Sequence, residues 1–219
     1  MRMPNRPIEW AFVRLIASAV VMVIALKLIG RDVVESMLPL VRWIIAGMDD
    51  HYRVLALGLA SQADDTVIML KVSLVKPLTI GGHTLYPHPL GVAQVTTLLG
   101  NALQPLVLAI IAISVWPCKA FTEWLLRAVI VVTMMFFLFM LDMPFVLLGE
   151  LQAALVAAYS PGSFSGLVAW KGFMQGGGRL ALGLACGALS VVAAQYIVVR
   201  FLRHGEYALR WLTPGRAQT

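Results

Sequence analysis

The sequence predicts an α-helical integral membrane protein with about four transmembrane helices and a small extracytoplasmic antiparallel β-meander. Hydrophobic residues make up 60% of the chain and charged residues 13%, whereas soluble domains average about 45–50% and about 25%. Residues 128–141 carry no charge and are apolar on every side of a helix, which places such a helix in lipid or in a large protein core. A chain of 219 residues is too short for a core of that size, so lipid is the predicted surrounding.

The charged residues are distributed as in a membrane protein. The net charge is +6, but Lys and Arg form no basic run and stand at the ends of apolar segments, where membrane borders usually carry them. We therefore expect no nucleic-acid partner. The two cysteines, Cys118 and Cys186, are far apart in the sequence, which disfavours a disulfide framework. Neither has a histidine at a similar depth, which a thiol nucleophile would need.

Residues 1–31 are predicted to form an N-terminal transmembrane anchor. The apolar segment from Trp10 to Ile29 contains two charged residues, Arg14 and Lys27. They lie near its opposite ends, so their long side chains can reach the two interfaces. The segment then has the ~20 residues that a spanning helix requires. A cleaved signal peptide is the alternative, but the residues after Ile29 offer no small-x-small cleavage site.

An amphipathic helix is predicted between Asp32 and Met48, at the start of the second unit, residues 32–91. Apolar residues recur there at helical spacing, while the charged residues fall on the other face. Pro39 is expected to bend or interrupt this helix, because proline lacks a backbone donor and clashes with the preceding turn. The apolar face consists of Val34, Met37, Leu38, Val41, Ile44, Ile45 and Met48.

The rest of this unit is predicted to be the β-meander, lying on the membrane helices. Ile68, Leu70, Val72 and Leu74 point to one side and Lys71 and Ser73 to the other, which is typical of a half-buried strand. Gly81-Gly82 stands between two short extended runs and predicts a hairpin turn. The expected three or four strands fall at 54–60, 66–75, 78–80 and 83–86.

Two further units follow. Residues 92–149 are expected to form a transmembrane helical hairpin, with spans at Val92–Trp116 and Arg127–Gly149. Residues 150–178 are apolar but broken by a Ser-Pro-Gly-Ser sequence and by three consecutive glycines. This pattern favours two short interfacial or re-entrant pieces over another crossing.

Residues 179–219 are predicted to hold a fourth transmembrane helix, Leu180–Val199, and a basic cytoplasmic tail. The helix is rich in Gly and Ala, which favours close packing inside the bundle. Four crossings put both termini on one side, and that side holds most Lys and Arg of the short segments. The positive-inside rule then predicts cytoplasmic termini in a bacterial inner membrane, with the meander outside.

Asp142, Asn101 and Gln104 are the candidate intramembrane polar residues. An ionisable side chain inside a span is a functional hypothesis, but Asp142 has a structural alternative. It can bind backbone amides freed by Pro144, or a partner such as Arg179. The amides of Asn101 and Gln104 can line a polar path, although hydrogen bonding between helices is their more ordinary use.

No catalytic, cofactor-binding or metal-binding residue is predicted. Metal-binding residue types occur at His83 and His88 and at residues 49–51, Asp64 and Asp65. The spacing of these residues matches no regular zinc pattern. Solvated turn residues are therefore predicted, with no cofactor.

The order of segments from Leu85 to Leu148 resembles that of exosortases and archaeosortases, membrane transpeptidases that process C-terminal sorting signals. The shared order is a short extended stretch, a spanning helix, a tight proline-containing turn and a second span. The family's catalytic residues are not matched: residues 99–101 read Leu-Gly-Asn where its cysteine would stand, and residues 142–145 read Asp-Met-Pro-Phe in place of Asn-x-x-Arg. No histidine follows until His204. The resemblance covers under a third of the chain and implies a non-catalytic relative or an accessory protein.

The predicted function is that of a non-enzymatic membrane subunit or accessory factor of a bacterial envelope assembly, in protein sorting or surface-polymer export. The expected partners are membrane lipid and another membrane protein, and no small-molecule substrate is identified. Two alternatives stay open. One is an exosortase-like transpeptidase with an unrecognised site, and the other is a small transporter that uses the three intramembrane polar residues.

Overall fold

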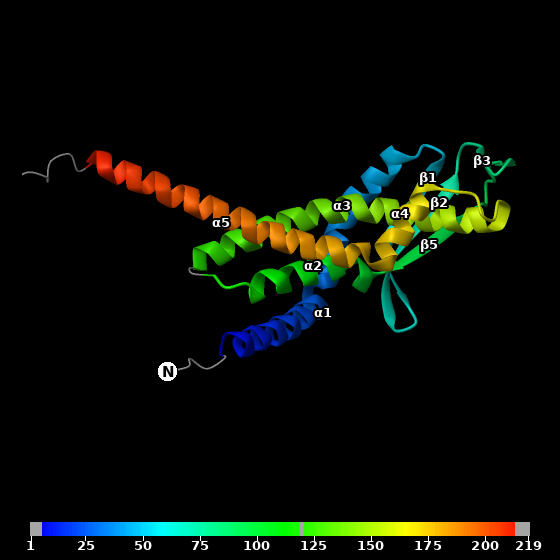
Figure 1. Cartoon of the computed structure of the whole chain (residues 1–219). Helices are drawn as coiled ribbons and strands as arrows, with labels where there is room; N and C mark the ends of the chain where they lie inside the picture. The colour runs from blue at the N-terminus through cyan, green and yellow to red at the C-terminus, as the bar shows by residue number, and fades with distance from the viewer. Residues whose placement is uncertain (1–5, 119–120, 213–219) are drawn as a thin grey trace, which may run out of the picture.

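The protein is an elongated bundle of helices with a small sheet at one end (Figure 1). The computed structural model describes residues 6–118 and 121–212. Within them the elements follow in this order: α1 (Arg6–Met48), β1 (Tyr52–Gln62), β2 (Asp65–Leu74), β3 (Leu78–Ile80), β4 (His83–Leu85), β5 (Ala93–Leu98), α2 (Leu99–Val115), α3 (Phe121–Tyr159), α4 (Gly166–Phe173), the π-helical turn η1 (Met174–Gly178) and α5 (Arg179–Leu212).

Three helical segments in the described chain are long and apolar enough to cross a membrane: Phe12–Met48, Phe121–Tyr159 and Gly166–Arg200. The helix α2 is equally apolar but has only 17 residues. Large side chains such as Leu28 and Phe137 are exposed on the outer faces of the bundle, as they are on helices that face lipid. The helical class is therefore confirmed, with three long apolar segments and one shorter one.

The expected break between the anchor and the amphipathic helix is wrong. Both belong to the single helix α1, which continues through Pro39. Leu38 and Val41, on either side of the proline, are buried in the core. This packing fixes the helix across the site of the missing backbone hydrogen bond, while Pro39 itself faces outward.

The sheet has the order β1-β2-β5, with both pairs antiparallel. The β1–β2 hairpin and the β3–β4 hairpin are present as predicted, and Gly81 and Gly82 form the second turn with φ angles of 56° and 86°. The β3–β4 hairpin is, however, a separate two-stranded sheet. The strand beside β2 is β5, in which Val95 pairs with Leu70.

Strand β5 corrects the predicted second span. Residues 93–98 were expected to begin the helix Val92–Trp116, but the helix begins only at Leu99. The segment contains Thr96 and Thr97, whose β-branched side chains favour strands, and β2 offers an unpaired edge for it. Because residues 93–98 form a strand, α2 is shorter than the predicted span.

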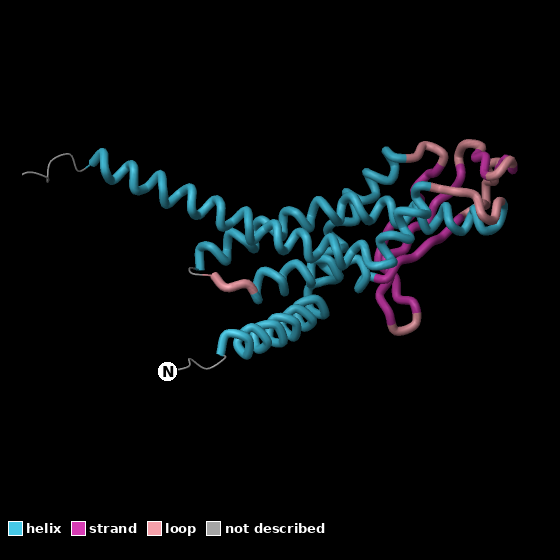
Figure 2. The backbone as a smooth tube through the Cα atoms, in the orientation of Figure 1, coloured by secondary structure: helices cyan, strands magenta, loops and turns pink. Residues whose placement is uncertain are grey.

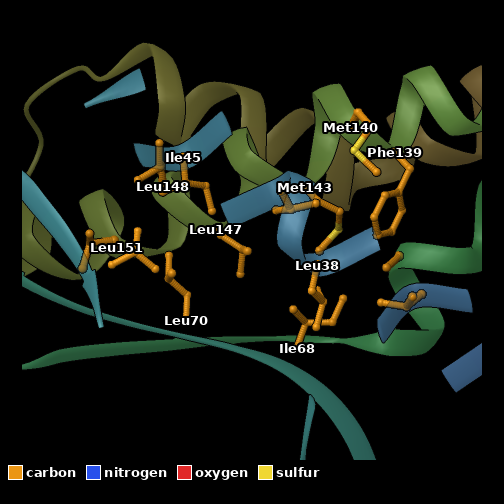
Figure 3. Packing of buried hydrophobic residues seen from close by; sticks show 14 of the residues in the cluster. Leu38, Ile45, Ile68, Leu70, Phe139, Met140, Met143, Leu147, Leu148 and Leu151 are labelled. Atoms are coloured by element: carbon orange, nitrogen blue, oxygen red, sulfur yellow. The ribbon is translucent and has the colours of Figure 1, made fainter. Parts of the chain in front are cut away.

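One face of the sheet and the helices share a single core (Figure 3). Val34, Leu38, Val41 and Ile45 of α1 pack there with Ile68 and Leu70 of β2 and with the α3 side chains from Phe139 to Leu151. Each fully buried Val, Leu or Ile stabilises the fold by about 1.5–3 kcal/mol. Most of the apolar face of the predicted amphipathic helix is therefore covered by the protein's own sheet and helices, while Met48 stays exposed.

The helix predicted for the third span continues beyond Gly149. The helix α3 runs for 39 residues to Tyr159, about 58 Å at 1.5 Å per residue, because Leu147, Leu148 and Leu151 bury against the sheet. Residues 150–159 therefore continue α3 and do not form a separate short segment. The short helix α4 continues into α5 across a kink at Gly177, where φ is 119°.

The predicted close packing of the fourth span is confirmed. Gly183 and Gly187 of α5 approach Pro105 and Ala109 of α2 so closely that a Cβ atom at Gly183 would lie 2.6 Å from the Pro105 carbonyl oxygen. Figure 2 shows the resulting layout: the α2–α3 loop lies at one end of the bundle and the strands at the other.

Candidate functional site

Of the two structural partners expected for Asp142, backbone amides or Arg179, the structure shows an ion pair with Arg179. Arg179 Nε donates a hydrogen bond to Asp142 Oδ2 at 2.8 Å, and the side chains are only 3% and 7% exposed for Arg179 and Asp142. Asp142 lies in the middle of α3, while Arg179 is the first residue of α5. The pair therefore joins α3 to the kink that ends at Gly178.

Three polar atoms around this pair have no hydrogen-bond partner among the described residues. They are Oδ1 of Asp142, Nη2 of Arg179 and Nε1 of Trp170. The Trp170 indole interacts with Asp142, but without the geometry of a full hydrogen bond. Trp170 also contacts Phe145 and Phe173, at ring-centroid distances of 6.0 Å. One carboxylate oxygen thus holds Arg179, and the other is an unused acceptor.

Asp142 also lines a cavity of about 290 Å³ between α1, α2 and α3. The remaining lining is apolar apart from backbone atoms, and it includes Met37, Leu106, Val132 and Phe136. Among the described residues, Asp142 is the one ionisable side chain in the wall. We call this space the Asp142 cavity.

Asn101 and Gln104 do not join this site. Both are exposed on α2, and no hydrogen bond from either side chain occurs in the described part of the chain. The neighbouring Ala102 and Leu103 face the cavity instead. The structure therefore gives no polar path from the two amides to Asp142, and neither amide bonds between helices as the sequence predicted.

A second buried ion pair was not predicted. Arg127 is fully buried and pairs with Glu123, four residues earlier on α3. It also donates hydrogen bonds of 3.1 Å to the carbonyl oxygens of Trp116 and Pro117, so it ties the end of α2 to the start of α3. The i,i+4 spacing of Glu123 and Arg127 is a sequence signal for this pair.

A third ion pair connects α4 to α3. Lys171 Nζ lies 2.7 Å from Glu150 Oε2, and Gln175 Nε2 donates to Glu150 Oε1 at 2.7 Å. These side chains are partly exposed, since the Lys171 and Glu150 side chains are 20% and 22% accessible. The contact holds α4 and η1 against α3.

The acidic cluster before the sheet is satisfied by its own neighbours. The ligand atoms of Asp49, Asp50 and His51 lie within 4.8 Å of one another, and His51 Nδ1 is 2.9 Å from Asp49 Oδ1. Lys76 forms an ion pair with Asp50, and this contact lowers the pKa of Asp50. The Lys76 ammonium group thus neutralises Asp50.

The other four residues of metal-binding type do not join this cluster. Asp64 and Asp65 belong to the β1–β2 turn, His83 begins β4, and His88 Nδ1 accepts a hydrogen bond from the Leu90 backbone at 3.2 Å. Among the described residues, the cluster with metal-ligand geometry contains none of these four.

Comparison with protein-family models, with curated proteins and with solved structures finds no match to this chain. The expected resemblance to exosortases therefore stays a prediction. Function has to be argued from the geometry.

Proposed function

We propose that this protein is a multi-pass inner-membrane protein of a bacterium and a non-enzymatic accessory subunit of an envelope assembly, in protein sorting or surface-polymer export. The main observation behind this proposal is the sheet. The helices α1 and α3 pack against it at one end of the bundle, and no other strand pairs with its edges. Such an end suits the binding of a second protein.

The charge distribution supports an orientation with the sheet outside. In residues 31–91, five Lys and Arg stand against six Asp and Glu. At the other end of the bundle lie the α2–α3 loop, whose carbonyl oxygens Arg127 binds, and the basic C-terminal part of α5 (Figure 1). Cytoplasmic segments carry an excess of Lys and Arg, which supports the proposal that both termini are cytoplasmic.

The sheet end offers a partner two features. Strand β1 has 11 residues and pairs on one side only, with β2, and an open edge can accept another strand. Exposed apolar side chains, which we call the apolar rim, lie close by on the β4–β5 and α3–α4 loops. The rim consists of Tyr86, Leu90, Val92 and Phe164, and Leu90 and Phe164 are 85% and 89% exposed.

The buried charges support a structural role over catalysis. Asp142 is paired with Arg179, and Glu123 with Arg127. A catalytic acid or base has to reach a substrate proton, whereas these groups hold helices together. Residues 99–101 and 142–145, where the exosortase pattern would place its catalytic groups, contain the exposed Asn101 and the paired Asp142.

Partner binding is tested by gentle detergent extraction and pull-down of the intact protein from its own membranes. We expect wild type to retain a membrane protein of a sorting or export system. The variant Leu90→Asp with Tyr86→Ser should lose it. Trp43→Ser on α1 is the matched control, because Trp43 and Tyr86 are both 74% exposed. If the intact, active protein purifies alone as a monomer, the partner hypothesis fails and the transporter alternative gains support.

Orientation is tested with a membrane-impermeant maleimide on intact cells. A cysteine at the exposed Thr84, in a Cys118→Ala background, should react, whereas native Cys118 should react only after permeabilisation. Both positions are exposed in the structure and lie at opposite ends of the bundle. The reverse labelling would contradict the orientation without affecting the partner hypothesis.

A further inference from the structure

The backbone of β1 faces away from β2 at alternate residues. Gln62 and Asp65 pair on either side of a two-residue turn, and residues in these positions are joined by a hydrogen bond. Along an antiparallel strand, residues that bond to the neighbouring strand alternate with residues that face away from it. Counting back from Gln62, the N–H and C=O groups of Leu57, Leu59 and Ser61 therefore point away from β2.

A contact near the start of β1 supports this direction and limits the open edge. The His51 carbonyl oxygen accepts a hydrogen bond from the Val75 backbone N–H, so His51 faces β2 and Val54, three residues later, faces outward. Arg42 Nη2 donates a hydrogen bond of 3.2 Å to the Val54 carbonyl oxygen, which occupies this acceptor. A bulge follows Val54, so the open edge begins at Leu57.

Groups of opposite charge stand at the two ends of this edge. Arg42 and Arg53 lie beside its N-terminal end, and Asp64 and Asp65 follow its C-terminal end. Residues 54–63 between them carry no charge. All four charged side chains are exposed, and no ion pair among the described residues includes any of them. The β1–β2 turn stands clear of the helices in Figure 2, so these charges are accessible to a second chain.

We propose that β1 binds an extended segment of a second protein as an added strand along Leu57–Ser61. The segment runs antiparallel to β1, because both strand pairs of this sheet are antiparallel and such pairing is slightly more stable per residue. It carries a basic side chain towards its N-terminal end, beside Asp64 and Asp65. It carries an acidic side chain towards its C-terminal end, beside Arg42 and Arg53. Backbone hydrogen bonds supply the affinity, and the charges fix direction and register.

The inference rests on the proposed function, in which the sheet end binds a second protein, and it specifies the form of the bound segment. The opposite edge of the sheet is less suited to this role. Strand β5 has only 6 residues and continues directly into α2, whereas β1 has 11 residues and ends in an exposed turn.

The experiment measures the binding of two synthetic peptides to the full-length protein in detergent micelles by fluorescence anisotropy. Both peptides alternate Thr and Val, have blocked ends and carry the same fluorophore on a flexible N-terminal spacer. One begins with Lys and ends with Glu, and the other begins with Glu and ends with Lys, so their compositions are identical. We expect the Lys-first peptide to bind about fivefold more tightly at low salt, which is the effect of two exposed ion pairs.

Two variants at Ser61 test the backbone contact. Ser61→Pro removes an outward N–H group, and proline is tolerated at such a position of an edge strand. We expect this variant to keep the unfolding transition of wild type and to bind the Lys-first peptide about fivefold more weakly, which is the effect of one hydrogen bond. Ser61→Ala keeps the N–H group and is the matched control with unchanged binding.

A charge exchange tests the direction of the added strand without changing the backbone. In the triple variant Arg53→Glu with Asp64→Lys and Asp65→Lys, the Glu-first peptide should bind more tightly than the Lys-first peptide. An unchanged preference would overturn the proposed direction, because the Glu-first peptide matches the charges of wild type only when it runs parallel to β1.

The proposal is overturned if neither peptide binds wild type at millimolar concentration, if the two bind equally, or if Ser61→Pro binds as tightly as Ser61→Ala. If the pull-down retains a membrane protein while neither peptide binds, the added strand fails and the accessory role stands. If the pull-down retains no protein while the Lys-first peptide binds as expected, the accessory role fails and the added strand stands.

Discussion

Removing only one member of the Asp142–Arg179 ion pair is predicted to lower the free energy of unfolding more than the loss of any other contact in the bundle. Asp142→Leu would leave the Arg179 guanidinium, which is 3% exposed, without its counter-ion. Arg179→Leu would leave the Asp142 carboxylate in the same position. Removing one partner of a buried pair destabilises a protein by about 3–5 kcal/mol, so each single variant should lose that much stability.

The double variant is expected to behave very differently. Replacing both members of a buried pair with apolar residues is often neutral or stabilising, and the pair lies among aromatic side chains that can accept leucines. We expect Asp142→Leu with Arg179→Leu to lie within about 1 kcal/mol of wild type. A double-mutant cycle then gives a coupling free energy of several kcal/mol.

The assay is reversible unfolding of the full-length protein in mixed detergent micelles, followed by tryptophan fluorescence. The control is the same cycle on Glu150 and Lys171, whose side chains are 20–22% exposed. A partly solvated pair should give a coupling of at most about 1 kcal/mol. Additive effects of Asp142→Leu and Arg179→Leu, or single losses no larger than those of the control pair, would refute the buried-pair argument.

Three smaller predictions follow from other contacts. Gly183→Ala should destabilise the protein measurably in the same unfolding assay, because its Cβ would lie 2.6 Å from the Pro105 carbonyl oxygen. The control Gly172→Ala, with no atom within 4 Å of its Cβ, should be neutral or slightly stabilising. Equal effects of the two variants would contradict the close α2–α5 contact. Burial, and then the negative charge of Asp49, raise the pKa of Tyr52 to about 12, so the stability contribution of Tyr52 is complete below pH 10 and is lost between about pH 10 and 12. Absorbance titration should show a late tyrosinate step that Tyr52→Phe removes, and persistence of that step in the variant would refute the assignment. Changing Cys118 and Cys186 to Ala should leave the retained partner and the cellular phenotype intact, and a null phenotype at normal protein level would support the enzyme alternative.

Local pattern was sufficient for several features. The apolar stretches around residues 128–141 and 180–199 were recognisable because a helix in lipid has to be apolar over its own length. The alternation of Ile68, Leu70 and Val72 identified the buried face of β2, and Gly81-Gly82 marked the turn of the β3–β4 hairpin. In each case the deciding residues lie within one element, so the sequence alone contained the evidence.

The tertiary structure decided the features that depend on a distant partner. Residues 93–98 form a strand because β2 has an open edge for them, and α1 stays continuous at Pro39 because the sheet packs on both sides of it. Asp142 finds Arg179 37 residues away, which the sequence offered only as one of two possibilities. The cavity beside Asp142 was not predicted at all, because a cavity between three helices arises from their fit and has no signature in any one of them.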